Sequence, residues 1–396
     1  MPLEFDESRL EDPRAGEEAL RGLASAAARV RAARTAAAEA DLEVLARDGR
    51  PRAVVVLGAG AAATVGDICA AALGPGCPVP VVPVRGYRLP GWVGGPDLVV
   101  AVEPPTAGAA PPVPAGEEPP GPPAPAPAPA STIGQIRPSH DAVAACAAEA
   151  ARRGCRFLAI GPAGGAPAAV AEQFRAPSIA LAQVGGPAET PWGAVAALLT
   201  AVSRAGVAGP PEGAYDALAE RLDRAAMAYG PSVETWDNPA KSAAVEIAGR
   251  IPVIGGGTPT ALAAAEHWVS RLAAVARYPA VRGGSPELLG DHVSLVGGPF
   301  GGSGPRSIFD DPVEDGAVGL RLVLLRDPEE VPEAARDLAL AADTAREQGV
   351  EVSEYTADEG GPLERAAGLI ALTDYATVYV AVAYGTDPLD HTLVVR

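Results

Sequence analysis

The chain has 396 residues and is long enough for two domains, each with its own hydrophobic core. Hydrophobic residues make up 48% of it, which argues for a folded globular protein and against disorder. A formal net charge of −18 argues against non-specific nucleic-acid binding, because nucleic-acid phosphates would be repelled.

The first half begins with helix and continues as an α/β alternation. Residues Glu17 to Ala46 are alanine-rich, so we expect one long helix or two shorter ones there. Short continuous apolar runs, which are typical of parallel strands buried on both faces, then alternate with helical stretches. The predicted strands are Arg52–Leu57, Val79–Val84, Asp97–Val102, Arg156–Gly161 and the segment Ser178–Val184. The predicted helices run from the glycine turn Gly58–Gly66 through Ala72, over Asp141–Gly154 and over Trp192–Ala205.

The stretch from Glu103 to Ser131 interrupts this alternation. It is proline-rich and of low complexity, so it has too little apolar surface to fold alone. We predict a disordered, partly polyproline-II insertion that serves as a linker. A motif that docks a partner is the alternative.

The second half repeats the pattern after a connecting helix at Tyr215–Tyr229. Its predicted strands are Ile251–Ile254, Val293–Val296, Leu320–Leu325 and Val350–Tyr355, and its predicted helices are Thr260–Ala276, Glu329–Gln348 and Pro362–Ala383. Alternating strands and helices imply right-handed crossovers and a doubly wound parallel sheet in each half. The predicted fold class is therefore α/β, with two flavodoxin-like lobes.

The cysteines, the histidines and the distribution of apolar residues indicate the cellular compartment and the kinds of site to expect. The four cysteines have no CxxC spacing and the four histidines are scattered, so we expect free thiols and no metal site. The acidic N-terminal stretch has no apolar segment like that of a signal peptide, and no run of 18 apolar residues lacks glycine, proline or charge. We therefore expect a cytoplasmic protein that does not span a membrane.

One stretch, Pro231–Gly257, carries a family resemblance. It combines a Pro-Ser-Val entry, an Asn238-Pro-Ala-Lys241 helix start and a buried strand that ends in glycines. In order and spacing it resembles the central segment of the bifunctional phosphoglucose/phosphomannose isomerases, whose two halves are sugar-isomerase (SIS) domains. Further segments with this resemblance are Pro80–Val93, Gly58–Asp67, Arg277–Ala280, Pro286–Leu288, Leu372–Tyr379 and Gly385–Pro388, so that it covers about residues 50–100 and 135–396.

The resemblance implies two SIS domains and a sugar-phosphate ligand. The implied division is an N-terminal helical segment at 1–50, a first SIS domain at 51–207 with the insertion at 104–131, a connecting helix at 208–245 and a second SIS domain at 246–396. It also implies a homodimer that binds a hexose phosphate in carbohydrate metabolism and, if active, interconverts aldose and ketose phosphates through an enediol without cofactor or metal.

Several phosphate-binding positions of that family differ in this chain. Family members present backbone N–H groups and a serine hydroxyl from a glycine-rich turn, which suits an anion at a helix N-terminus. Here Gly58 and Gly60 remain, Ala62 replaces the serine, and Thr64 is the nearest hydroxyl. A plain tight turn is the alternative interpretation. In place of the second phosphate loop stand Glu103, two prolines and Thr106. Thr106, or Ser139 beyond the insertion, is the candidate substitute, and Trp192 replaces an arginine.

The catalytic positions differ as well. The glutamate that moves the proton between C1 and C2 corresponds to Ala274, and the ring-opening histidine corresponds to Gly290. Loss of a general base typically costs roughly 10²–10⁴-fold in rate. We take Glu287 and His292, which flank the histidine position, as the candidate acid/base pair; Glu266 and His267 are a second pair on the preceding helix.

Two hypotheses follow and both stay open. In the first, the protein binds a hexose phosphate at Gly58, Gly60, Thr64 and Ser139 and isomerises it with Glu287 and His292. In the second, it is a sugar-phosphate sensor, or a scaffold partner of another sugar enzyme, without catalysis.

Overall fold

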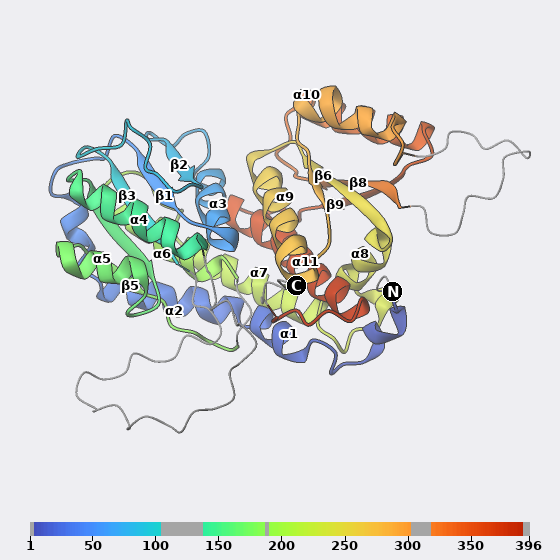
Figure 1. Ribbon diagram of the computed structural model, residues 1–396, viewed down its shortest axis with the longest axis horizontal. Helices are drawn as coiled ribbons and strands as arrows, with labels where there is room; N and C mark the ends of the chain where they lie inside the picture. The colour runs from blue at the N-terminus through green and yellow to red at the C-terminus, as the bar shows by residue number, and fades with distance from the viewer. Residues whose placement is uncertain (1–3, 104–137, 187–189, 302–317, 391–396) are drawn as a thin grey trace, which may run out of the picture.

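The computed structural model describes residues 4–103, 138–186, 190–301 and 318–390, and of residues 138–141 only the backbone. The predicted insertion at 104–131, with Thr106, lies outside the described residues. Two parallel sheets lie side by side with helices packed between them (Figure 1). The predicted α/β class, with a parallel sheet in each half, is therefore confirmed.

The first sheet has the strand order β2-β1-β3-β4-β5, and every pairing is parallel. Val54 and Val56 of the interior strand β1 point into one hydrophobic core, and Val55 and Leu57 point into another. Burial on both faces explains why this strand is a continuous apolar run in the sequence. The strands are β1 Val54–Leu57, β2 Val81–Val84, β3 Leu98–Val102, β4 Arg156–Gly161 and β5 Ser178–Ala180.

Helices cover both faces of the first sheet. α4 and α5 contribute to the core on one face, and α2, α3 and α6 to the core on the other. The helices are α1 Glu17–Ala24, α2 Ala26–Glu39, α3 Ala63–Leu73, α4 Pro138–Arg152, α5 Ala166–Phe174 and α6 Trp192–Arg204, with 3-10 turns η1 Glu7–Glu11, η2 Leu42–Ala46 and η3 Gly60–Ala62. α5 is not predicted from the sequence, because glycine and proline surround its start.

The second sheet is smaller, with the parallel strand order β7-β6-β8-β9. α10 packs on its outer face, while α9 and α11 pack on the face toward the first domain (Figure 1). Its strands are β6 Arg250–Gly256, β7 Val281–Arg282, β8 Gly319–Arg326 and β9 Glu351–Thr356. The remaining helices are α7 Ala214–Ala228, α8 Pro239–Ile247, α9 Pro259–Arg271, α10 Pro332–Glu347 and α11 Pro362–Ala383, with a 3-10 turn η4 Thr235–Asp237.

One expectation for the second half is wrong, and one predicted helix changes type near its end. The predicted strand at Val293–Val296 is a 3-10 turn, η7 Val293–Gly297, and the edge strand of the sheet is β7 instead. Val293 and Val296 are three residues apart and both turn into the outer core, which is a helical spacing that so short an apolar run conceals. The predicted helix Thr260–Ala276 changes character at Arg271, after which Leu272–Ala276 forms a π-helical turn, η5.

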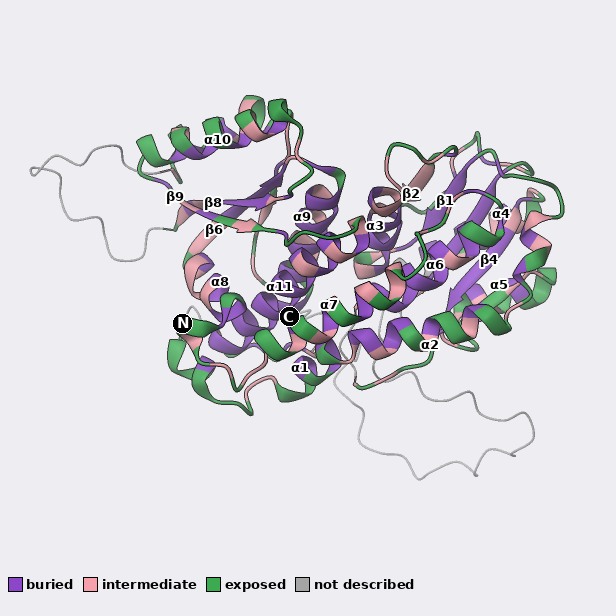
Figure 2. Ribbon diagram, turned by 180° about the vertical axis from the view of Figure 1, so that it is seen from behind, coloured by how far each residue is buried: buried purple, intermediate pink, exposed green. Residues whose placement is uncertain are grey.

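One hydrophobic core joins the two domains. It contains Val56 of the first sheet, Val323 of the second, and apolar side chains of α2, α3, α6, α7, α8, α9 and α11. Figure 2 shows this buried interior between outer helices that expose one side to solvent. α11 is long and apolar enough to span a membrane by length and composition, but 94% of that stretch is buried, and we identify it as the central core helix.

α8 shows why the Asn-Pro-Ala-Lys stretch begins a helix. Asn238 is the N-cap: its side-chain oxygen accepts hydrogen bonds from the N–H groups of Ala240 and Lys241, at 3.0 and 3.2 Å. Lys241 is 1% exposed, and its amine donates to the carbonyls of Pro231 and Val233. Burial lowers the pKa of the Lys241 amine. The signature that carries the family resemblance is therefore a buried structural unit.

Replacing Asn238 with alanine should lower the free energy of unfolding by about 1–2 kcal/mol, because two N–H groups at the start of α8 lose their acceptor. Urea unfolding followed by circular dichroism measures this change. Asp237→Ala, at the exposed neighbouring position, is the control and should shift the midpoint by much less. Equal shifts for the two variants would contradict the capping role.

Candidate functional site

The glycine turn between β1 and α3 is shaped by two glycines. A β-carbon on Gly58 would lie 2.5 Å from the carbonyl oxygen of Ala62, closer than real contacts allow. Gly60 has φ +56°, in the left-handed region that favours glycine. The turn thus folds the backbone tightly against the N-terminal end of η3 and α3.

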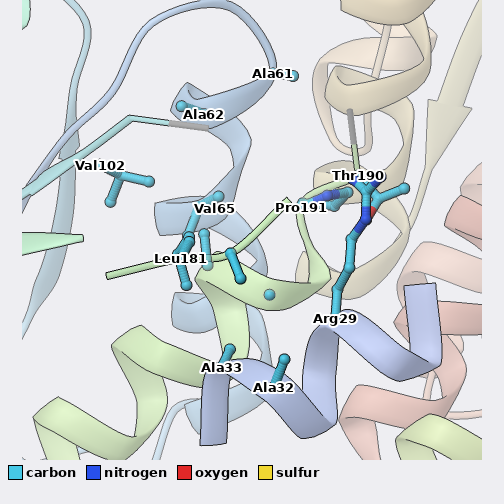
Figure 3. Close-up of a pocket in the computed structure, with 13 residues that line it drawn as sticks. Arg29, Ala32, Ala33, Ala61, Ala62, Val65, Val102, Leu181, Thr190 and Pro191 are labelled. Atoms are coloured by element: carbon cyan, nitrogen blue, oxygen red, sulfur yellow. The ribbon is translucent and has the colours of Figure 1, made fainter. Parts of the chain in front are cut away.

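A small cavity lies beside this turn, at the carboxyl end of β3 (Figure 3). Ala61 and Ala62 line it from the start of α3, and Thr190 and Pro191 line it from the start of α6. Arg29 of α2 reaches into the same region. About 20 Å³ is open to the centre of a water molecule, which is room for a single water.

Arg29 brings a cationic side chain to this cavity. Arg29 is 6% exposed and donates hydrogen bonds to the carbonyl oxygens of Val184 and Gly186. The described residues that line the cavity include no aspartate or glutamate. Two helix N-termini add their partial positive charges, so in an acidic protein this cavity favours an anion.

Thr64 does not line that cavity. Its side chain is buried at the junction of the two domains, where its oxygen lies 2.9 Å from the carbonyl oxygen of Ala61 and 3.1 Å from Nδ1 of His267. Of the predicted ligand-binding residues, Gly58 and Gly60 are thus in the glycine turn, while Thr64 joins α3 to α9. Ser139 lies in the first turn of α4, and its side chain is outside the described part of the chain.

His267 continues this contact into the second domain. Its Nε2 lies 2.8 Å from Oδ1 of Asp374 in α11, and Nε of Arg271 lies 3.4 Å from the same oxygen. His267, Asp374 and Arg271 are all less than 5% exposed. His267 belongs to the second acid/base pair predicted from the sequence, but it is completely buried and forms part of the domain junction.

Closer to the surface, a set of charged side chains also connects α3 to α9; we call it the outer layer. Arg85, just after β2, pairs with Asp67 of α3 and lies 3.8 Å from Glu266 of α9, and Arg282 of β7 lies 3.2 Å from Glu266. Burial raises the pKa of the Asp67 carboxyl. Glu266, the other residue of the second predicted pair, thus stands within an ion-pair chain between the domains.

The predicted acid/base pair lies in the second domain. Glu287 is exposed and immediately precedes the π-helical turn η6, Leu288–His292, which ends at His292. The ring of His292 lies against Gly283, just after β7, and its Nδ1 is buried without a hydrogen-bond partner. Glu287 and His292 are close in sequence, but within the described part of the chain no hydrogen bond joins them.

The two positions that the sequence resemblance assigns to a catalytic glutamate and histidine carry no titratable side chain. Ala274 is exposed on η5. Gly290 is exposed on η6, and a β-carbon there would meet no atom within 4 Å. Both positions have room for a larger side chain, so packing does not explain the small residues.

Comparison with known proteins identifies the class. Residues 236–396 match the family described as the bacterial phospho-glucose isomerase C-terminal SIS domain. Among solved structures, a candidate phosphosugar isomerase from Silicibacter pomeroyi DSS-3 aligns over 97% of this chain and 100% of its own length, with a TM-score of 0.53 and 19% identity. The C-terminal domain of glucosamine-fructose-6-phosphate aminotransferase from Francisella tularensis aligns over 93% and 96%, with a TM-score of 0.62 and 10% identity.

A further candidate phosphosugar isomerase, from Clostridium difficile 630, aligns over 94% of this chain and 95% of its own, with a TM-score of 0.60 and 13% identity. The comparison with curated proteins found no match. The chain is thus an α/β protein built from two SIS domains. More narrowly, its second domain, at residues 236–396, is of the type described as the bacterial phospho-glucose isomerase C-terminal SIS domain.

Replacing Gly58 with alanine should destabilise the protein by about 1–3 kcal/mol, since the new methyl group would collide with the backbone at Ala62. Chemical unfolding measures the loss. Gly76→Ala is a matched control, because a β-carbon there meets no atom within 4 Å. If both variants unfold at the same denaturant concentration, the turn does not depend on the missing β-carbon.

Proposed function

We propose that this protein binds a hexose phosphate through the cavity beside its glycine turn. One observation carries the proposal: two helix N-termini and the buried guanidinium of Arg29 converge on a cavity that the described residues line without a carboxylate. A phosphate dianion is stabilised by such an environment. The cavity now has room for one water, so binding requires α2 and α6 to draw back from the turn.

We further propose that binding, rather than isomerisation, is the principal activity. An aldose–ketose isomerase needs a base that takes the proton from one sugar carbon and returns it to the next. Ala274 and Gly290 have no side chain that transfers a proton. A sugar-phosphate sensor, or a scaffold partner of another carbohydrate enzyme, fits this arrangement. By kinship with the family we expect a cytoplasmic homodimer.

Isomerisation by Glu287 and His292 is the second candidate function. The unpartnered Nδ1 of His292 favours it, because a buried polar atom without a partner is a group held ready for a ligand. His292 also lies beside the residue that follows β7, and ligands of parallel sheets bind at the carboxyl ends of strands.

Saturating glucose, fructose or mannose 6-phosphate should raise the melting temperature, since a ligand at 100 times its Kd adds about 2.7 kcal/mol to stability. Differential scanning fluorimetry measures the shift. Arg29→Met should weaken binding about tenfold or more, because a charged hydrogen-bond donor is lost. Arg31→Met, on the exposed side of the same helix, is the control. Absence of any shift in the wild type would refute ligand binding at this site.

A coupled assay for conversion of mannose or glucose 6-phosphate to fructose 6-phosphate should show no turnover above background, because the usual base and histidine positions are Ala274 and Gly290. Turnover that disappears in both Glu287→Gln and His292→Ala would instead establish the second candidate function. Turnover that survives both substitutions would exclude that pair while still overturning the non-catalytic assignment.

A further inference from the structure

The Thr64 hydroxyl, which has a single proton to donate, lies near two groups that can accept it. Its oxygen lies within hydrogen-bond distance of the Ala61 carbonyl and of Nδ1 of His267, at 2.9 and 3.1 Å. A hydroxyl donates only one hydrogen bond. If it donates to Ala61, Nδ1 must carry a proton and donate to Thr64. If Nδ1 is unprotonated, the hydroxyl turns to His267 and leaves Ala61.

The other ring nitrogen of His267 is fixed by Asp374. Nε2 lies 2.8 Å from Oδ1 of Asp374, and an ionised carboxylate only accepts hydrogen bonds, so Nε2 carries a proton in both cases. The proton that varies is therefore the one on Nδ1, which faces α3. Its presence makes His267 a cation; its absence leaves the ring neutral.

The groups around His267 come from every helix that packs against it. α11 supplies Asp374, with Tyr375 beside it, and α3 supplies Thr64. On α9 itself, Arg271 lies against Asp374, while Glu266 faces Arg85 and Arg282 in the outer layer. Arg271 and Asp374 balance each other in charge, so a protonated His267 adds one net positive charge at the first turn of α3.

We propose that His267, held by Asp374, is a positioning residue that links protonation to anion affinity at the glycine turn. Protonated His267 fixes the Thr64 hydroxyl on Ala61, which lines the anion cavity, and adds a positive charge behind it. Sugar-phosphate binding is then accompanied by proton uptake, and affinity falls as the pH rises and Nδ1 loses its proton. By linkage, the bound anion favours the protonated ring to the same extent. This inference rests on the proposed function of the cavity.

The test is isothermal titration calorimetry between about pH 5.5 and 8.5, the range in which histidines titrate. Glucose 6-phosphate is compared with glucose 6-sulfate, because the phosphate itself changes charge near pH 6 and the sulfate does not. For the wild type we expect sulfate-ester affinity to fall about tenfold across this range, by the loss of one nearby charge. Titrations in buffers of different ionisation enthalpy should show proton uptake.

His267→Gln should remove both the pH dependence for the sulfate ester and the proton uptake. Because His267 is completely buried, Thr64→Val and Thr64→Ser serve as a second pair that keeps the ring in place. The valine should reduce proton uptake, since Nδ1 loses its partner, and the serine should restore it. A pH profile unchanged in all three variants would overturn the positioning role but leave binding intact. If the wild type binds neither ester at any pH, the proposed function and this inference both fall.

Discussion

The contact between α3 and α9 sets the position of the glycine turn relative to the second domain. Thr64, His267 and Asp374 form a continuous hydrogen-bonded chain through three helices, and each is buried to at least 97%. Buried polar groups are costly unless paired, so moving any of these helices would expose an unpaired donor or acceptor. Because α3 begins directly after the glycine turn, these hydrogen bonds also fix the position of the turn.

The shared core reinforces that constraint. α11 packs against α7, α8 and α9, and its apolar side chains belong to the same cluster as those of the first sheet. Two domains joined by a continuous apolar core do not move independently, unlike domains that share a small polar interface. α3 and α9 are therefore held firmly against each other. A small shift of α9, caused by a change of charge at His267, also shifts the glycine turn.

Burial also distinguishes the residues that carry the family resemblance from the positions at which the resemblance implied catalytic side chains. Asn238 and Lys241 are buried, and both make hydrogen bonds to the backbone, so substitutions there cost stability. Ala274 and Gly290 are exposed, and a small residue at either place disturbs no packing. A protein can lose catalytic side chains at such positions and keep the whole scaffold.

The sequence predicts most of this fold, because buried parallel strands and long apolar helices leave strong patterns. β1, β4 and α11 are found within two residues of their predicted ends, and the Asn238 cap lies where its signature predicts. The two-residue strand β7 has no pattern of its own, since its place in the sheet depends on pairing with β6. The junction is equally hidden, because Thr64 and Asp374 are far apart in sequence and only the packed helices bring them to His267.

Thr64, His267 and Asp374 follow the order hydroxyl, imidazole and carboxylate. The same order is found in enzymes where a histidine activates a nucleophile. Exposure decides between the two uses. A nucleophile must touch its substrate, whereas Thr64 is 1% exposed and its oxygen is enclosed by Ala61 and His267. Of Ala61, Thr64, His267 and Asp374, only Ala61 lines the cavity, so these groups influence a ligand through the position and charge of the turn. In a solvent-exposed site these three groups would activate the hydroxyl for attack. Buried as they are here, they position the glycine turn instead, and the protonation of His267 affects that position.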